Sequence, residues 1–213
     1  MTGRLIVLEG GEGTGKTTQA RRLARHLGAT LTFEPGATPI GARIRDLLLD
    51  PEVKGLDARA EALLLAADRA QHVAEVVGPA LERGEVVVSD RFVGSSLAYQ
   101  GHGRQLDLTE VARLSEWATG GLVPDVVVLL ELAVHEAHAR LAQRHGAGGG
   151  AGAHEYGGDR MEREERAFHE RVAQGFRELA AADTGRWVVV DAGGSVDEVG
   201  DRVLDAVRSR VDL

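Results

Sequence analysis

Short apolar runs alternate along the chain with longer stretches in which apolar residues recur at helical spacing. Five short runs, rich in valine and leucine, are apolar at consecutive rather than alternate positions. This pattern is typical of strands whose two faces are both covered by helices. The expected strands are residues 4–8, 29–33, 85–89, 125–130 and 186–190.

The longer stretches predict helices between these strands. They cover residues 16–27, 41–49, 57–83, 107–119, 134–145, 159–182 and 195–211. Ser195 and Glu198 have the spacing of a capping box at the start of the last helix. Strands that alternate with helices require crossover connections, which are right-handed and give parallel strands. The sequence therefore predicts one α/β domain over 1–213, a doubly wound five-stranded parallel sheet flanked by helices.

Composition narrows the class of protein. The chain has 33 acidic and 25 basic residues, a formal net charge of −8, which argues against long nucleic acid as a partner. It contains no cysteine, so disulfides and thiolate metal sites are excluded. No apolar run approaches the about 20 residues of a membrane helix, and the apolar stretch before Glu9 is too short for a signal peptide. We expect a cytoplasmic protein without membrane contact.

A glycine-rich segment lies between two of the predicted helices. Residues 146–158 contain seven glycines and too few apolar side chains to pack a core. Such a segment is either a surface linker or a lid that moves over a ligand. These residues alone leave both interpretations open.

A phosphate-binding loop follows the first predicted strand and opens the first helix. Its residues match G-x-x-x-x-G-K-[ST] in full and are Gly10, Gly11, Glu12, Gly13, Thr14, Gly15, Lys16 and Thr17. The backbone N–H groups of such a loop bind phosphate oxygens, Lys16 reaches the β- and γ-phosphates, and the Thr17 hydroxyl binds Mg²⁺. An accidental glycine turn is disfavoured because pattern and context agree. The loop indicates a nucleotide such as ATP but does not identify the reaction.

A second magnesium ligand is expected at the end of the third strand. The apolar run 86–88 ends in Ser89 and Asp90, and a carboxylate at this position holds Mg²⁺ through water in proteins with this loop. Taken alone the signal is weak, because many strands end in aspartate for the sake of the following turn.

Several further motifs occur in a fixed order. They are EPGATP at 34–39, AADRAQH at 66–72, DRF at 90–92, SSLAYQG at 95–101, GLVPD at 121–125 and FHERV at 168–172. Together with the phosphate-binding loop they resemble bacterial thymidylate kinases over essentially the whole chain. The resemblance implies transfer of the ATP γ-phosphoryl group to dTMP, giving dTDP for dTTP synthesis, with Mg²⁺. It also suggests a homodimer packed through helices.

The resemblance assigns roles to individual side chains. It implies that Arg45 and Arg91 bind the 5′-phosphate of dTMP, that Glu12 accepts a hydrogen bond from the 3′-hydroxyl, and that Tyr99 lies against the sugar. Thymine is implied to be bound by Arg69, Gln100, Ser96 and, through apolar contact, Leu65. Simpler interpretations stay open: a surface charge for Arg45, an ion pair with Glu61 or Asp68 for Arg69, a loop cap for Gln100, and a core position for Tyr99.

Members of this family keep a transition-state arginine either in the phosphate-binding loop or in a lid. Positions 11–14 contain no arginine here. The resemblance therefore implies that the cation comes from the lid, over about 144–160, from Arg144 or Arg160. This favours the lid over the linker for the glycine-rich segment, and leaves the choice between the two arginines open.

Three positions depart from the family pattern. Leu65 stands where an aromatic ring normally stacks on thymine, Phe33 replaces the usual arginine before the EPG motif, and Phe92 replaces the common tyrosine after Asp90 and Arg91. Leu65 and Phe33 keep one alternative open, a related nucleoside monophosphate kinase with another base or sugar preference. A further alternative, a P-loop module that binds nucleotide without turnover, is disfavoured because Lys16, Thr17, Asp90, Arg91 and the lid arginines are all retained.

Overall fold

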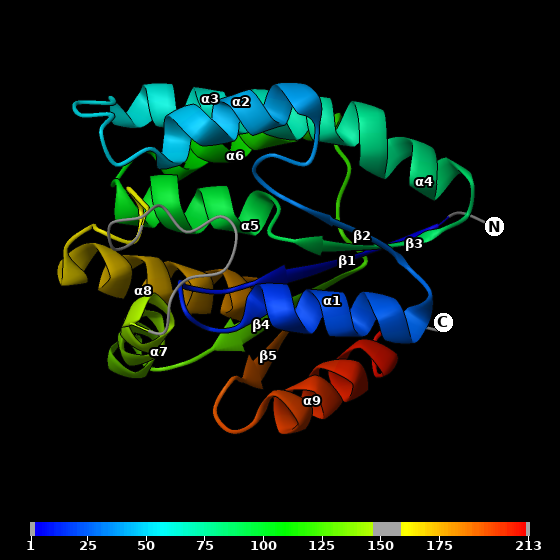
Figure 1. The fold of residues 1–213 in the computed structure, drawn as a ribbon. Coiled ribbons are helices and arrows are strands. Elements are labelled where there is room, and N and C mark those ends of the chain that lie inside the picture. The colour runs from blue at the N-terminus through cyan, green and yellow to red at the C-terminus, as the bar shows by residue number, and fades with distance from the viewer. Residues whose placement is uncertain (1–2, 147–158, 212–213) are drawn as a thin grey trace.

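The computed structural model describes residues 3–146 and 159–211. Its centre is a five-stranded sheet in the order β2-β3-β1-β4-β5, with every neighbouring pair parallel (Figure 1). The strands are β1 (Arg4–Glu9), β2 (Thr30–Phe33), β3 (Val86–Asp90), β4 (Val126–Glu131) and β5 (Trp187–Asp191). The predicted fold class and all five strands are confirmed, within about two residues at each end.

Helices connect the strands and cover both faces of the sheet. In chain order the helical elements are α1 (Lys16–Leu27), α2 (Pro39–Leu49), α3 (Ala58–His72), the π-helical turn η1 (Val73–Val77), α4 (Gly78–Glu82), α5 (Val93–Ser96), the π-helical turn η2 (Leu97–Gly103), α6 (Leu108–Thr119), α7 (Val134–Gly146), α8 (Arg166–Ala182) and α9 (Val196–Arg208). The capping box at Ser195 and Glu198 is present at the start of α9.

Two helical predictions were wrong in their extent, and one helical segment was not predicted. The stretch 57–83 is divided into α3, η1 and α4, because Pro79 lacks the N–H that a continuous helix needs at that position. The stretch 159–182 becomes helical only at Arg166, since the Asp159 carboxylate accepts the N–H groups of Met161 and Glu162 in a turn. The helical segment 93–103 was not predicted, because its glycines and serines hide the pattern.

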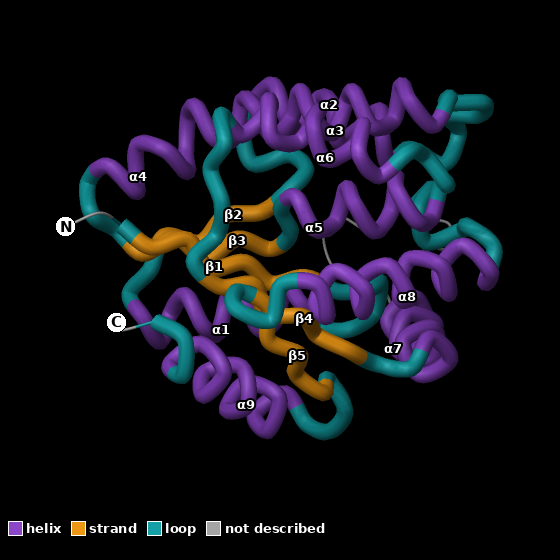
Figure 2. Tube along the Cα trace, turned by 180° about the vertical axis from the view of Figure 1, so that it is seen from behind, coloured by secondary structure: helices purple, strands orange, loops and turns teal. Residues whose placement is uncertain are grey.

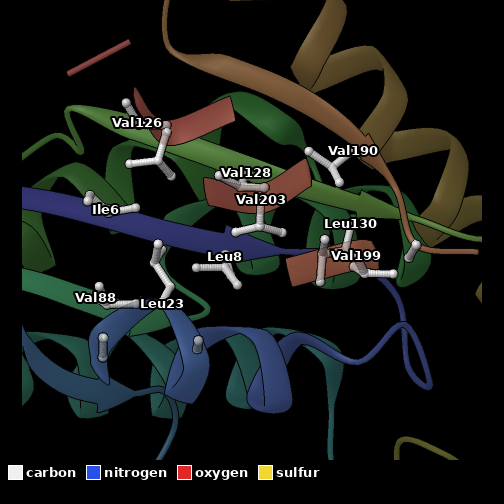
Figure 3. Close-up of a cluster of buried hydrophobic side chains, with 14 of the residues drawn as sticks. Ile6, Leu8, Leu23, Val88, Val126, Val128, Leu130, Val190, Val199 and Val203 are labelled. Carbon is white, nitrogen blue, oxygen red and sulfur yellow. The ribbon is translucent and has the colours of Figure 1, made fainter. Parts of the chain in front are cut away.

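One face of the sheet packs against α1 and α9. Ile6 and Leu8 point to this face and meet Leu23 of α1 and Val203 of α9 in a buried apolar cluster (Figure 3). Side chains of a strand alternate between its two faces, so Leu5 and Val7 point to the opposite side. The core on this face is therefore made by one helix from each end of the chain.

The opposite face of the sheet is covered by α4, α5 and α8 together with the two π-helical turns (Figure 2). Phe92, which is completely buried, packs there on Leu5 and Val7. Helix α3 packs against both α2 and α6 beyond this layer, at the end of the molecule farthest from α9 (Figure 1).

The carboxyl ends of β1 and β3 lie side by side. Leu8 of β1 is paired in register with Asp90, the last residue of β3. The phosphate-binding loop leaves β1 at this edge, and the loop that carries Arg91 leaves β3 there. In open α/β sheets ligands bind at this edge of the strands. The phosphate-binding loop and Arg91 therefore lie where ligands bind in this class of fold.

Candidate active site

The phosphate-binding loop has the backbone conformation that its glycines permit. Gly10, Gly13 and Gly15 have φ values of 145°, 75° and 91°, in the region that favours glycine. A Cβ atom at Gly13 would lie 2.4 Å from the carbonyl oxygen of Ala137 in α7. The loop is thus held against α7, with α1 beginning directly after it at Lys16.

Lys16 is folded back over this loop. Its ammonium group donates a hydrogen bond of 2.6 Å to the carbonyl oxygen of Gly11, and its side chain is 6% exposed. Burial, together with the neighbouring charge of Arg91, lowers the pKa of Lys16 to about 8 although nearby carboxylates oppose the shift. A nucleotide phosphate would supply the anionic partner that this buried ammonium group favours.

Thr17 and Asp90 are brought together as the sequence predicted. The Thr17 hydroxyl donates a 2.5 Å hydrogen bond to Oδ2 of Asp90. The other carboxylate oxygen, Oδ1, is buried and accepts no hydrogen bond from any described residue. An unpartnered carboxylate oxygen beside a hydroxyl is a suitable pair of ligands for Mg²⁺, which takes hard oxygen ligands and keeps several waters.

Arg91 is held in an unusual backbone conformation. Its φ of 75° lies in the left-handed region that non-glycine residues rarely adopt. The turn is fixed by Glu9, whose carboxylate accepts hydrogen bonds from the backbone N–H groups of Phe92 (3.0 Å) and Ser95 (2.9 Å). The Ser95 hydroxyl donates to Glu9 (2.6 Å) and accepts from Arg91 Nη1 (3.0 Å). Glu9 thereby connects the end of β1 to the guanidinium group.

Glu12, Arg91 and Tyr99 form a cluster beside the loop. Arg91 Nη2 donates to Oε1 of Glu12 and to the Tyr99 hydroxyl (3.2 Å), and that hydroxyl donates to the same Glu12 oxygen (2.9 Å). Burial alone would raise the pKa of Glu12, but the charges of Arg91 and Lys16 hold it at about 2. Glu12 is therefore an ionised hydrogen-bond acceptor, as its predicted role toward a hydroxyl group requires.

Arg69 forms a buried ion pair, but with Glu34 rather than with the alternatives Glu61 or Asp68. Its Nε donates to Glu34 (2.9 Å), and both side chains are almost completely buried. Further guanidinium hydrogen bonds reach the Ser96 hydroxyl and the carbonyl oxygen of Phe92, each at 3.0 Å. The predicted thymine-binding residues Arg69 and Ser96 are thus in direct contact.

Gln100 lies in a second buried cluster, around Glu61. Its Nε2 donates to Glu61 at 2.8 Å, and Arg104 donates to both oxygens of the same carboxylate at 3.2 and 3.1 Å. Arg160 also belongs to this cluster, because its Nη2 donates to Glu61 (2.6 Å) and its Nε to the carbonyl oxygen of Leu48 (2.7 Å). Within the described residues none of the hydrogen bonds of Arg160 reaches the phosphate-binding loop.

The remaining predicted residues lie apart from these clusters or outside what the structure describes. Arg45 donates to the carbonyl oxygen of Pro35 (2.8 Å) and stacks over Phe33, with 5.9 Å from Cζ to the ring centroid. Leu65 is half-buried in α3. The side chain of Arg144 lies outside the described part of the chain, as does most of the segment 144–160.

Three glutamates that position other groups were not identified as site residues from the sequence. Glu9, Glu34 and Glu61 are all buried, with exposed fractions of 0%, 5% and 1%. Only Glu34 carried a local signal, its place in the EPG motif. The partners of Glu9 and Glu61 are at least 39 residues away along the chain, so no short motif could have indicated them.

Comparisons with known proteins agree with this geometry. A family model described as thymidylate kinase matches residues 8–203. The chain is 46% identical to a thymidylate kinase of Cutibacterium acnes over 99% of this chain and 97% of that one, and 47% identical to one of Leifsonia xyli over 98% and 96%. A crystal structure of thymidylate kinase from Ehrlichia chaffeensis superposes with a TM-score of 0.77 at 25% identity, covering 97% of this chain and all of that one.

Proposed function

The chain belongs to the thymidylate kinase family, and on this basis we propose that it transfers the γ-phosphoryl group of ATP to dTMP, forming dTDP and ADP. The observation that carries the proposal is the convergence of Lys16, the Thr17–Asp90 pair and Arg91 at the carboxyl ends of β1 and β3. The reaction needs cations at the point where two phosphate groups meet, and these residues supply them.

The attacking atom in this reaction is a phosphate oxygen of dTMP. That phosphate is already largely dianionic at neutral pH, because its second pKa is about 6. No general base is therefore required. The protein must instead align the phosphates of ATP and dTMP and neutralise the charge of the phosphoryl group as it is transferred. The buried ammonium group of Lys16 is suited to the β- and γ-phosphates, and the fork of Arg91 to the phosphate of dTMP.

The cluster around Glu12 suits the sugar of dTMP. Glu12 would accept a hydrogen bond from the 3′-hydroxyl, and the ring of Tyr99, which is held edge-on by Phe168 and Phe176, would lie against the sugar. Arg69 and Ser96 would donate to O4 of thymine, and Gln100 would pair with N3. The contact between Arg69 and Ser96 supports their action on the same part of the base. Arg45 would reach the phosphate from α2.

Magnesium would be bound by Thr17 directly and by Asp90 through water. The unpartnered Oδ1 of Asp90 supports this assignment. When bound, the ion would supply positive charge that neutralises the charge developing on the phosphate groups during transfer.

The transition-state arginine stays a prediction for Arg144 or Arg160 in a lid over about 144–160. The ion pair of Arg160 with Glu61 favours Arg144, since Arg160 would have to leave a buried carboxylate to reach the transferring phosphoryl group. The lid belongs to the same single domain in this proposal.

A homodimer through α2, α3 and α6 is supported by apolar side chains on these helices. Four of them are unusually exposed, namely Ile40 (52%), Leu47 (44%), Leu63 (58%) and Trp117 (84%). Exposed apolar groups that gather on neighbouring helices are typical of protein interfaces. Sedimentation velocity should give a dimer for the unmodified chain and a monomer for Trp117→Lys.

Radiolabel transfer tests the proposed reaction. The protein is incubated with Mg²⁺, dTMP and ATP labelled at the γ-phosphate, and the products are separated by chromatography. We expect the label in dTDP, in equal amount with the ADP formed. Label that appears only in inorganic phosphate would show an ATPase and would reject the proposal. Among the helices that the structure describes, none has the length and apolar character of a membrane span.

A further inference from the structure

The amide of Gln100 is buried and asymmetrically bonded. The side chain is 1% exposed, and its nitrogen Nε2 donates a 2.8 Å hydrogen bond to Oε1 of Glu61. Its oxygen Oε1 is buried and has no hydrogen-bond partner among the described residues. A buried polar atom without a partner is costly and in a native protein requires an explanation. Here the unpartnered atom is an acceptor.

The charge of Glu61 decides which end of this amide is free. Glu61 accepts from Arg104 and from Arg160 as well as from Gln100. Although burial opposes ionisation, these donors lower the pKa of Glu61 below its ordinary value. An ionised carboxylate can only accept hydrogen bonds. Gln100 must therefore present its NH₂ group to Glu61, and its carbonyl oxygen is left for another donor.

The free oxygen belongs to the region that binds the base in the proposed function. Gln100 follows Ser96 by about one helical turn along α5 and η2, and the Ser96 hydroxyl accepts a 3.0 Å hydrogen bond from Arg69. The preceding residue, Tyr99, contacts Glu12 and Arg91 of the phosphate end. The amide of Gln100 thus lies on the segment that connects the base-binding residue Ser96 to the cluster at the phosphate end.

We propose that Glu61 is a positioning residue for base selection, which fixes the amide of Gln100 so that only a base with an N–H donor at N3 is accepted. This inference rests on the proposed function. Thymine and uracil carry a proton on N3 and can donate to Oε1 of Gln100. Cytosine carries a lone pair on N3, so two acceptors would face each other and the buried oxygen would stay unpaired.

The charge of Glu61 is also what prevents the alternative pairing. A neutral glutamine at position 61 could present either its carbonyl oxygen or its NH₂ group to Gln100. The Gln100 amide could then turn over and donate Nε2 to N3 of cytosine. Loss of the charge therefore relaxes selection between bases, whereas a purely structural role would lower activity with all substrates alike.

The test compares kcat/KM for dTMP, dUMP and dCMP in the unmodified chain and in Glu61→Gln. The ratio of dUMP to dCMP removes the 5-methyl group from the comparison and reports on N3 and position 4 of the base. Because Glu61→Gln leaves Arg69 and Ser96 unchanged, the change in this ratio on substitution reports on the amide of Gln100. We expect this ratio to fall by at least about tenfold, the effect of one unpaired buried hydrogen-bonding group. The ratio of dTMP to dUMP, which reports contact with the methyl group, should stay unchanged.

Two further variants separate the amide from its surroundings. Glu164→Gln removes the second carboxylate bound to Arg104 but leaves Glu61 ionised, so the dUMP to dCMP ratio should equal that of the unmodified chain. In a Gln100→Met background, Glu61→Gln should have no additional effect on the ratio. If Glu61→Gln fails to fold, the charge-balanced double variant Glu61→Gln/Arg104→Gln carries the same expectation.

An unchanged dUMP to dCMP ratio in folded Glu61→Gln would overturn the inference, as would an equal fall in Glu164→Gln. A parallel loss with all three substrates would do so as well. These results are distinct from a failure of the proposed function, in which the unmodified chain itself would show no preference for dTMP over dCMP.

Discussion

Glu9, at the phosphate end of the site, and Glu61, at the base end, are both buried carboxylates with opposite surroundings. Glu9 accepts hydrogen bonds from two backbone N–H groups and one hydroxyl, and burial raises its pKa to about 7. Glu61 is bonded directly to two arginines and one amide, and its pKa is lowered. The donors to Glu9 and the nearby charge of Arg91 do not offset its desolvation, whereas two guanidinium groups bonded directly to Glu61 offset the desolvation there.

This difference separates the tasks of the two regions. At the phosphate end the raised pKa of Glu9 reduces its negative charge, and the counter-charge that Arg91 contacts is the carboxylate of Glu12. The ammonium group of Lys16, which donates to the carbonyl oxygen of Gly11, is available for the phosphates. At the base end the ionised Glu61 accepts hydrogen bonds from every group that surrounds it, which fixes the geometry. We therefore expect variants of the phosphate end to change turnover, and variants of the base end to change stability and selectivity.

The largest effect is expected from Lys16→Ala. Loss of the ammonium group removes the cation assigned to the transferring phosphates, so kcat should fall by roughly a thousandfold. The fold should persist, because burying the ammonium group of Lys16 is unfavourable and its removal takes away no apolar core contact. Steady-state ADP release and thermal melting followed by circular dichroism measure the two quantities. Retained turnover would remove Lys16 from the mechanism.

The second effect contrasts Glu61→Gln with Glu9→Gln in stability. Removing the Glu61 charge takes the carboxylate partner from Arg160 and one of two carboxylate partners from Arg104, which should lower the free energy of unfolding by about 3 kcal/mol at neutral pH. Glu9→Gln should cost much less, since the Glu9 carboxylate is only marginally favoured over its neutral form there. Urea titrations of both variants give the comparison. Equal losses would contradict the different roles of the surrounding charges.

The third prediction uses pH to examine Glu9. The pKa of Glu9 rises from 4.5 to about 7 on folding. Between these two pH values the folded state therefore binds more protons than the unfolded state. The contribution of Glu9 to stability is thus lost as pH rises through about 7. Glu9→Gln cannot titrate. The stability of this variant relative to the unmodified chain should therefore increase from pH 5 to pH 8, by on the order of 2 kcal/mol. A difference that stays constant with pH would refute the raised pKa.

The smallest effect is expected at Leu65, the residue predicted to make apolar contact with thymine. Leu65→Phe would restore an aromatic ring for stacking on thymine, a contribution of about 0.5–1.5 kcal/mol. The KM for dTMP should fall several-fold while kcat changes little. The matched variant Leu63→Phe, on the exposed side of α3, should leave KM unchanged. An unchanged or higher KM in Leu65→Phe would indicate that other groups already fill this position.

The same two regions differ in how far the sequence predicts them. At the phosphate end the sequence indicated which residues would lie together, because they are consecutive in the chain or end adjacent strands, as Thr17 and Asp90 do. Glu9 is the exception, since its partners are distant in the chain. The base end is assembled from α3, η2 and the turn before α8. Glu61, Gln100 and Arg160 are far apart in sequence, and neither spacing nor periodicity indicates that they meet.

Arg160 illustrates this limit most clearly. The sequence offered it as one of two candidates for the transition-state cation, whereas the structure holds it in an ion pair with Glu61. Its position depends on where a non-helical turn at Asp159 directs the side chain, which a helical pattern over 159–182 could not predict. The location in the cytoplasm and the lid stay predictions from the sequence.

A substrate panel tests the central claim most directly. Values of kcat/KM are measured with ATP and Mg²⁺ for dTMP, dUMP, UMP, CMP and AMP under identical conditions. The proposed function predicts the highest value for dTMP, followed by dUMP, with CMP and AMP far below both. A value for dTMP no greater than those for the other monophosphates would contradict the assignment of this site to dTMP.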